Sequence, residues 1–246
     1  MTGPFALFKW QALLVDWKVF GQGLLTTVIV SLVALLIALV LGAVFGTFAT
    51  SRSAFLRTVN RVYVEFIQNT PLVIQVFFWY NGLPYIGIVL PTLIIGFAAL
   101  SIYTGAYVAE VVRSGIGAIP RGQLEAAYSQ GFTYAGAMRE IILPQAIKVM
   151  LPPLTNVAVN LIKNSSVLAI IAGGDLMYHT DSWSSGNLYY GPAYVFTGLL
   201  YFALCYPLTR LSRKLEEIFH AGDAAAESGT SAQAKPARTA IGGAKA

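Results

Sequence analysis

Long apolar stretches separated by polar connections are the main pattern of this chain, and they predict an all-α integral membrane protein. A membrane-spanning helix needs about 20 apolar residues. Residues 24–49 contain no charged side chain and meet this requirement. The pattern predicts four further spans, at residues 62–80, 91–112, 142–172 and 189–211. The fourth is long and contains Pro144, Pro152 and Pro153, so we expect it to bend.

The basic residues predict how these five spans are oriented. Of the 16 Lys and Arg residues, 12 fall in the connections on one side and 2 on the other, with Lys148 and Lys163 inside the fourth span. Cytoplasmic connections carry the excess of Lys and Arg. We therefore expect the N-terminus outside the cell and the C-terminus in the cytoplasm.

The two ends of the chain differ from the spans between them. Within residues 1–23, apolar residues recur at helical spacing, which suits a short helix in the membrane interface; a frayed terminus is an equally good interpretation. Residues 216–246 hold mostly small residues with scattered charges, which predicts a disordered cytoplasmic tail. The predicted membrane domain is 24–215.

The composition supports this class and excludes others. Hydrophobic residues make up 56% of the 246 positions and charged residues 11%. The isoelectric point near 9.3 does not indicate nucleic-acid binding, because the basic residues flank apolar spans and form no continuous face. Cys205 is the single cysteine, and the sequence has no Cys/His spacing typical of a metal site.

The connection between the third and fourth spans has the signals of an ordered element. Pro120 suits the first turn of a helix, and Gly131 suits the left-handed position after its end. Thr133 can cap a second helix that runs toward Ile141, and Pro144 marks the start of the fourth span. We expect a helix near 120–131, a turn and a second helix at the cytoplasmic surface.

Side chains in this element are suited to contact with another protein. Ala126 and Ala127 are small enough for a close approach, and Glu125 places a charge near the expected helix start, where the helix dipole favours it. An ordinary amphipathic loop helix would show the same periodicity. The spacing alone leaves both interpretations open.

A resemblance favours the first interpretation. The series Glu-Ala-Ala, three residues, Gly, nine residues, Ile, one residue, Leu-Pro resembles the loop signature of binding-protein-dependent ABC importer permeases, with Leu143 and Pro144 as its last two positions. Over residues 20–215 the chain looks like the polar amino-acid branch of that family, which carries histidine, glutamate, glutamine, arginine or opines. The stretches 63–72, 106–113 and 161–166 carry this likeness. Gln68 departs from the family, where Arg is commoner.

The resemblance implies a type I ABC importer transmembrane domain with several partners. The helix that contains Arg121, Glu125, Ala126 and Ala127 would dock on an ATP-binding subunit. A second permease subunit, identical or different, and an extracytoplasmic substrate-binding protein would complete the complex in the bacterial cytoplasmic membrane. The expected molecular contacts are these proteins, membrane lipid and an amino-acid substrate, without nucleic acid.

The sequence supports a separate ATPase on independent grounds. ATP hydrolysis of this kind needs a phosphate-binding loop that ends in Gly-Lys-Ser/Thr, and no Gly-Lys dipeptide occurs here. We therefore expect no catalytic residue, metal or cofactor on this chain, with Mg-ATP bound by the partner.

Ionisable residues inside spans are costly and mark candidate sites. Glu65 follows Arg61 by four residues and Glu110 precedes Arg113 by three, which favours structural ion pairs. These pairs lie near the inner ends of the second and third spans.

Lys163 lies deeper, about 20 residues into the fourth span, with Asn160 and Asn164 at helical spacing. These three residues predict a polar stripe along a substrate path that could meet an amino acid's carboxylate. Snorkelling of Lys163 to the outer surface, or its pairing with Asp175, is the alternative. Asn69 and Gln75 of the second span are weaker candidates for the path, in a stretch where Asn69 and Pro71 could break the helix.

The sequence thus favours a non-enzymatic permease of an ATP-driven importer that works by alternating access. A self-contained secondary carrier or channel is the first alternative, although the chain has no internal repeat, which carriers commonly show. An ABC permease for a solute other than an amino acid is the second. The sequence leaves open the particular amino acid, whether the permease pair is identical, and whether cargo binds this subunit.

Overall fold

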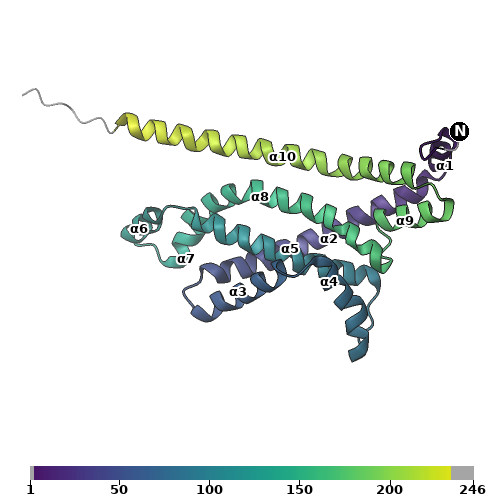
Figure 1. The fold of residues 1–246 in the computed structure, drawn as a ribbon. Helices are drawn as coiled ribbons and strands as arrows, with labels where there is room; N and C mark the ends of the chain where they lie inside the picture. Colours follow the sequence, from purple (N-terminus) through teal and green to yellow (C-terminus); the bar gives the residue numbers. More distant parts are fainter. Residues whose placement is uncertain (1–2, 234–246) are drawn as a thin grey trace, which may run out of the picture.

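The computed structural model describes the backbone of residues 3–233 and the side chains as far as residue 218. The described part of the chain is helical, without strands (Figure 1). Its long helices are α2 (Trp17–Thr50), α5 (Thr92–Gly117), α8 (Leu143–Asn164) and α10 (Tyr190–Gln233). The shorter elements are α1 (Leu7–Val15), α3 (Ala54–Gln68), α4 (Leu72–Phe77), η1 (Phe78–Gly82), η2 (Leu83–Ile86), α6 (Arg121–Ser129), α7 (Tyr134–Ala137), η3 (Met138–Ile142), η4 (Ser165–Ile171) and α9 (Leu176–Asn187).

Four helical segments among the described residues are long and apolar enough to cross a membrane: Trp17–Thr50, Thr92–Gly117, Tyr134–Ile171 and Tyr190–Ile218. The second predicted span has a different form, a shorter apolar helical segment at Leu72–Ile86. Its η1 and η2 turns project from the bundle on one side, whereas α3 lies against α2 and α5 (Figure 1). The all-α membrane class is confirmed.

The second predicted span is not one continuous helix, because it breaks at Asn69, Thr70 and Pro71. Pro71 has no backbone N–H to donate, and it disfavours helical dihedrals in the residue before it. The Gln75 amide closes the break by donating hydrogen bonds to the carbonyl oxygens of Ile67 (3.0 Å) and Thr70 (2.9 Å). The second of these bonds satisfies a carbonyl oxygen that the break leaves without a backbone donor.

The bundle is held together by a close approach of α2 and α5. A Cβ atom at Gly42 would lie 2.3 Å from side-chain atoms of Val108, and one at Gly46 would lie 2.5 Å from Val112. These glycines are four residues apart and therefore share a helix face, which lets two membrane helices approach closely. Any larger residue at either position would force α2 and α5 apart.

The fourth predicted span is helical from end to end but changes type along its length. The π-helical turn η3 leads into α8, and the 3₁₀-helical η4 follows it. Pro152 and Pro153 lie inside α8. The Ser212 hydroxyl of α10 donates a hydrogen bond of 3.0 Å to the buried Pro152 carbonyl, which joins these two helices.

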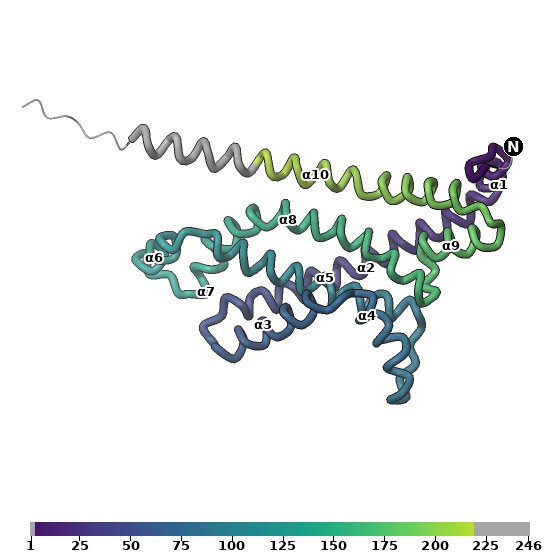
Figure 2. The backbone as a smooth tube through the Cα atoms, viewed as in Figure 1, coloured from purple at the N-terminus to yellow at the C-terminus, as the bar shows by residue number. Residues whose placement is uncertain are grey.

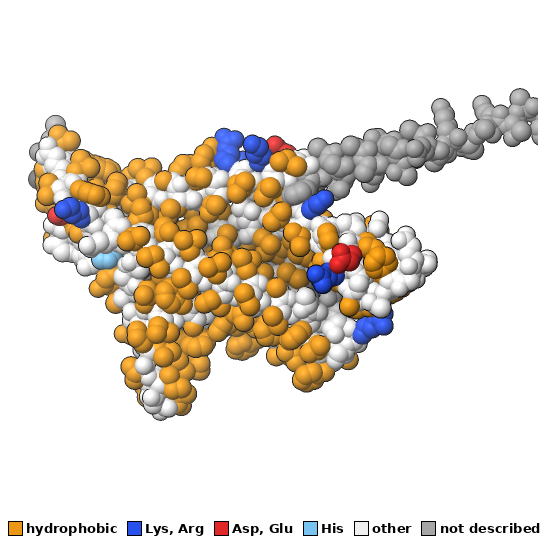
Figure 3. All heavy atoms as spheres, turned by 180° about the vertical axis from the view of Figure 1, so that it is seen from behind, with side chains coloured by type: hydrophobic (Ala, Val, Ile, Leu, Met, Phe, Trp, Pro, Cys, Tyr) orange, Lys and Arg blue, Asp and Glu red, His pale blue; other side chains and the backbone are white. Residues whose placement is uncertain are grey.

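The bundle has two distinct ends. The α6 end comprises α6, α7, the 51–53 connection and the start of α3, and the α9 end comprises α1, α9 and the start of α10 (Figure 2). An apolar surface lies between them, with most basic side chains toward the α6 end (Figure 3). This distribution suits a membrane-embedded middle. The orientation of the two ends across the membrane stays a prediction.

The terminal segments are helical where the structure describes them. α1 is a separate helix that ends before Asp16, and its Leu13 is buried. The aromatic ring of Phe8 lies against Tyr189, at 5.8 Å between ring centroids. α10 continues to Gln233 and so overlaps the predicted tail at 216–233, while 234–246 lie outside the described residues. The disorder of that tail stays a prediction.

Candidate functional site

The α6 element has the local geometry that its turn residues dictate. Pro120 immediately precedes α6, and Gly131 after its end has a φ of +83°. Only glycine adopts this left-handed backbone without a steric penalty. The Thr133 hydroxyl accepts a hydrogen bond of 3.2 Å from the Gly136 N–H and so caps α7. These features give a helix, a tight turn and a second helix at one end of the bundle.

The two alanines of α6 face opposite ways. Ala126 is exposed, as are Arg121 and Glu125, whereas Ala127 is only 1% exposed. Ala127 therefore packs inside the chain and does not offer a surface to a partner, contrary to the sequence-based expectation. The effect of the helix dipole is strong only in the first turn of a helix. Glu125 is the fifth residue of α6 and so lies beyond that turn. Arg121 occupies the first position instead.

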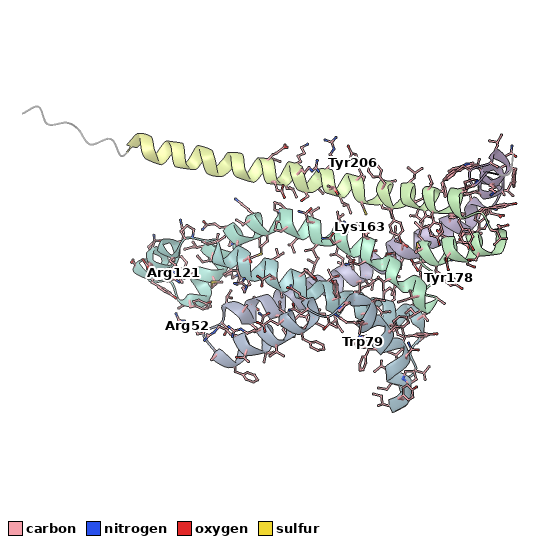
Figure 4. The ribbon with its side chains drawn as sticks, viewed as in Figure 1. Arg52, Trp79, Arg121, Lys163, Tyr178 and Tyr206 are labelled. Atoms are coloured by element: carbon pink, nitrogen blue, oxygen red, sulfur yellow. The ribbon has the colours of Figure 1, made fainter. Side chains whose placement is uncertain are left out.

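Arg52 lies in the connection between α2 and α3 and contacts both α6 and α7. One of its terminal nitrogens donates a hydrogen bond of 3.1 Å to the Tyr128 hydroxyl of α6. Its guanidinium carbon also lies 5.1 Å from the ring centroid of Tyr134 in α7, within the range of a cation–π contact. Figure 4 shows Arg52 and Arg121 at the same end of the molecule. Sequence reasoning counted Arg52 only as an orientation signal and missed this role.

The end of the loop signature joins the α6 element to α8. Ile142 is 5% exposed, and Leu143 begins α8 with Pro144 at its next position. Pro144 follows η3 closely and so lies inside a continuous helical segment, where its missing N–H removes one backbone hydrogen bond. Because η3 runs into α8 without a break, α7 and a membrane-spanning helix form one helical segment, Tyr134–Ile171. α7 is therefore continuous with the span, and α6 is joined to it by the turn at residues 130–133.

A polar cavity lies deeper in the bundle, between α5 and α8. Its volume is about 410 Å³, within the usual range for small-molecule pockets. Its polar lining residues are Tyr103, Thr104, Tyr107, Asn160, Lys163 and Asn164. We call it the Lys163 cavity. The hydroxyl groups of Tyr103 and Tyr107 lie 3.1 Å apart and share a hydrogen bond.

The ammonium group of Lys163 has no carboxylate partner within 4 Å among the described residues. The predicted alternative, a pair with Asp175, therefore does not form. Asp175 is buried and instead accepts a hydrogen bond from the Met177 N–H, at 3.0 Å. Lys163 also lines a second cavity of about 320 Å³ beside Tyr194 and Tyr201 of α10. An unpaired cation between two cavities can bind an anionic group.

Asn69 and Gln75 do not line the Lys163 cavity. The Asn69 amide donates a hydrogen bond of 2.7 Å to the Glu65 carbonyl oxygen and so ends α3. Gln75 closes the helix break and also borders a mainly apolar cavity of about 350 Å³ next to Phe78 and Trp79. The structure thus brings together Asn160, Lys163 and Asn164 and separates them from the other two path candidates.

Both predicted ion pairs are present. Two nitrogens of Arg113 donate hydrogen bonds to the two carboxylate oxygens of Glu110. Arg61 and Glu65 are farther apart, at 4.0 Å, and their side chains are well exposed. Exposed pairs of this kind add little to stability.

The arrangement of an ordered surface loop and a deeper polar cavity is matched by a known family. The sequence profile of the binding-protein-dependent transport system inner membrane component matches residues 38–217. The chain belongs to this family. Membership makes it a membrane transport subunit and confirms the resemblance seen in the loop signature.

Curated permease sequences are similar over most of their length. The probable glutamine ABC transporter permease protein GlnM of Bacillus subtilis (strain 168) is 42% identical over 208 residues, which cover 83% of this chain and 96% of that protein. The arginine transport system permease protein ArtQ of the same organism is 32% identical over 203 residues, 82% of this chain and 93% of that protein.

Solved structures show the same arrangement of helices. A chain from the crystal structure of an amino acid ABC transporter with histidines has a TM-score of 0.80 and 34% identity, and the match covers 85% of this chain and 97% of that chain. An inward-facing MetNI methionine ABC transporter has a TM-score of 0.67 with 17% identity, over 81% of this chain and 97% of that chain. The second likeness concerns the fold alone.

Proposed function

We propose that this chain is the permease subunit of an ATP-driven importer of a polar amino acid. The observation that carries the proposal is the unpaired Lys163 ammonium in a polar cavity of a family permease. Its ammonium pairs with the α-carboxylate of the cargo, and the amides of Asn160 and Asn164 bind polar groups beside it. The relatives named for glutamine and arginine transport support an amino acid as cargo.

The energy for transport comes from a partner. α6 docks on an ATP-binding subunit through its exposed residues Arg121, Glu125 and Ala126. Ala127 and Arg52 hold α6 against the bundle, so that motion of the partner reaches α8 through α7 and η3. Mg-ATP is bound by the partner, and this chain breaks no bond in the cargo.

The complex has two permease subunits and an extracytoplasmic binding protein that delivers the cargo. It resides in the bacterial cytoplasmic membrane, with the α9 end outside and the α6 end in the cytoplasm. Alternating access then exposes the Lys163 cavity to each side in turn. This orientation follows from the basic residues near the α6 end.

The test is uptake by the reconstituted complex. Proteoliposomes with the ATP-binding subunit inside and the binding protein outside are expected to accumulate L-glutamine when ATP is supplied. In Lys163→Met, we expect uptake at least about tenfold lower, since a hydrogen-bonded charge pair contributes roughly 1.5–3 kcal/mol. Lys148→Met is the matched control, because Lys148 lies exposed on the same helix and does not line the cavity.

Several outcomes would contradict the proposal. Equal uptake by Lys163→Met and the unsubstituted chain would exclude Lys163 as a cargo ligand. Transport by the purified chain without an ATP-binding subunit would instead indicate a self-contained carrier or channel. Uptake of only non-amino-acid solutes would replace the proposed cargo.

A further inference from the structure

Another polar cavity lies near the α6 end, apart from the Lys163 cavity. It has a volume of about 380 Å³ and lies between α3 and α5. Six of its lining residues are charged or strongly polar: Arg57, Asn60, Arg61, Glu65, Glu110 and Arg113. We call it the mixed-charge cavity. Both predicted ion pairs, one from each helix, thus line the same space.

The charges of this cavity are only partly satisfied by each other. Arg113 uses its Nε and Nη2 atoms on Glu110, and Arg57 uses Nη1 on the carbonyls of Ser51 and Arg52. A guanidinium carries five N–H groups, so donors remain on both. Arg61 has only the 4.0 Å contact with Glu65. The cavity therefore offers surplus donors for an anionic group.

The cavity also offers acceptors. Asn60 is 6% exposed, and its Oδ1 atom has no hydrogen-bond partner. A buried acceptor without a donor costs free energy, and such atoms commonly bind a ligand or water. Glu65 adds a carboxylate that its long contact with Arg61 leaves largely free. Both acceptors suit an ammonium group.

The net charge of the cavity restricts the chemical class of the ligand further. Three arginines against two glutamates give a net charge of +1 (3 − 2). This disfavours a simple metal cation, and the two carboxylates disfavour a compact anion such as inorganic phosphate. A ligand with an ammonium and an anionic group a few bonds apart would satisfy both sets of groups.

We propose that the mixed-charge cavity binds a zwitterion of this kind, with its anionic group on Arg61 and Arg113 and its ammonium on Asn60 Oδ1 and Glu65. A free α-amino acid and the headgroup of phosphatidylethanolamine share this chemistry. The free amino acid would be cargo on the side where it is released, and in that respect the inference rests on the proposed function. The site is separate from the Lys163 cavity and shares no lining residue with it.

The experiment uses the permease complex with its ATP-binding subunit and removes the Lys163 cavity as a competing site. Equilibrium binding of L-glutamine is measured for Lys163→Met in nanodiscs of phosphatidylglycerol, which has no ammonium headgroup. Binding is expected to remain, and to weaken about tenfold when Arg61→Gln is added, because one charged hydrogen-bonding group is lost. N-acetyl-L-glutamine, which lacks the ammonium, is expected to bind at least as weakly.

Arg139→Gln is the matched control. Arg139 is also an exposed arginine near the α6 end; it pairs with its neighbour Glu140 and does not line the cavity. Asn60→Leu provides a second variant, since it removes the unpaired acceptor without leaving a buried polar group. Elution of each variant with the ATP-binding subunit shows that the complex has assembled.

A second measurement distinguishes a free amino acid from a lipid headgroup as the ligand. Complexes from nanodiscs with phosphatidylethanolamine are analysed by native mass spectrometry for retained lipid. Retention that Arg61→Gln lowers and Arg139→Gln does not, without glutamine binding, assigns the site to the lipid headgroup. The inference would be overturned if neither glutamine nor the lipid binds, or if Arg61→Gln and Arg139→Gln have equal effects. It would also be overturned if inorganic phosphate displaces the bound ligand equally well. Loss of uptake in Lys163→Met is scored separately, so failure of the transport proposal remains distinguishable.

Discussion

At the α9 end, polar side chains are buried and bonded across helices, whereas at the α6 end most stay exposed. The Trp183 ring N–H donates a hydrogen bond of 2.8 Å to Asp16, and the Leu176 N–H donates one of 3.0 Å to Thr27. At the other end, Arg52 and Arg139 make their contacts at the surface. The α9 end is therefore internally braced, while the α6 end keeps polar groups available for a partner.

The largest expected effect concerns the one buried position of α6. Ala127→Glu places a charge where the native side chain is 1% exposed. Burial of an unpaired charge is costly, so α6 is expected to lose its packing against the rest of the bundle. We predict that uptake per ATP hydrolysed falls by about tenfold or more while the partner continues to hydrolyse ATP. Simultaneous assays of uptake and phosphate release in proteoliposomes measure this ratio.

Ala135→Glu is the control for Ala127→Glu, because Ala135 is exposed on the neighbouring helix α7. It is expected to leave the ratio nearly unchanged. A normal ratio of uptake to ATP hydrolysis in Ala127→Glu would show that transport does not need the buried packing of α6. The difference between the two ends would then have no effect on transport.

A smaller effect is expected from pH at the α9 end. Burial raises the pKa of the Asp175 carboxyl to about 6, although the Met177 N–H bond opposes this. Because the folded-state pKa is above the unfolded value, folding is favoured most below about pH 4, and this stabilisation is lost as pH rises toward 6. The change is on the order of 2 kcal/mol in the free energy of unfolding.

Unfolding midpoints of the purified complex between pH 4 and 7 measure this dependence. Asp175→Asn cannot titrate, so its difference from the unsubstituted chain is expected to vary with pH in the predicted direction. A constant difference across this range would contradict the prediction and would indicate that Asp175 keeps its charge when buried.

The smallest expected effect comes from the surface contact at the α6 end. Arg52→Ala removes the hydrogen bond to Tyr128 and the contact with the Tyr134 ring, which together contribute roughly 0.5–1 kcal/mol at this exposed site. Uptake per ATP is predicted to fall about twofold to fivefold, with intermediate values for Arg52→Lys, which keeps the charge. Measurement of this ratio for Tyr128→Phe isolates the hydrogen bond. If Arg52→Ala couples normally, α6 is held by its buried face alone.

Local signals in the sequence predicted the parts of the site that depend on backbone conformation. Pro120, Gly131 and Thr133 each favour one local geometry through sterics or a short-range hydrogen bond, so their effect does not depend on distant residues. The long apolar stretches predicted the spanning segments for the same reason. Proline also located the break in the second stretch, although the shortened helix that follows it was not expected.

The sequence by itself determined that this chain is a helical membrane protein with an ordered loop before its fourth apolar stretch, because hydrophobicity, proline and glycine act over a few residues. Only the tertiary structure decided that Ala127 faces inward, that Arg52 joins two connections 76 residues apart, and that two ion pairs share one cavity. These facts depend on how helices rotate and pack against one another. Helical spacing defines a face of each helix but not the neighbour that the face meets.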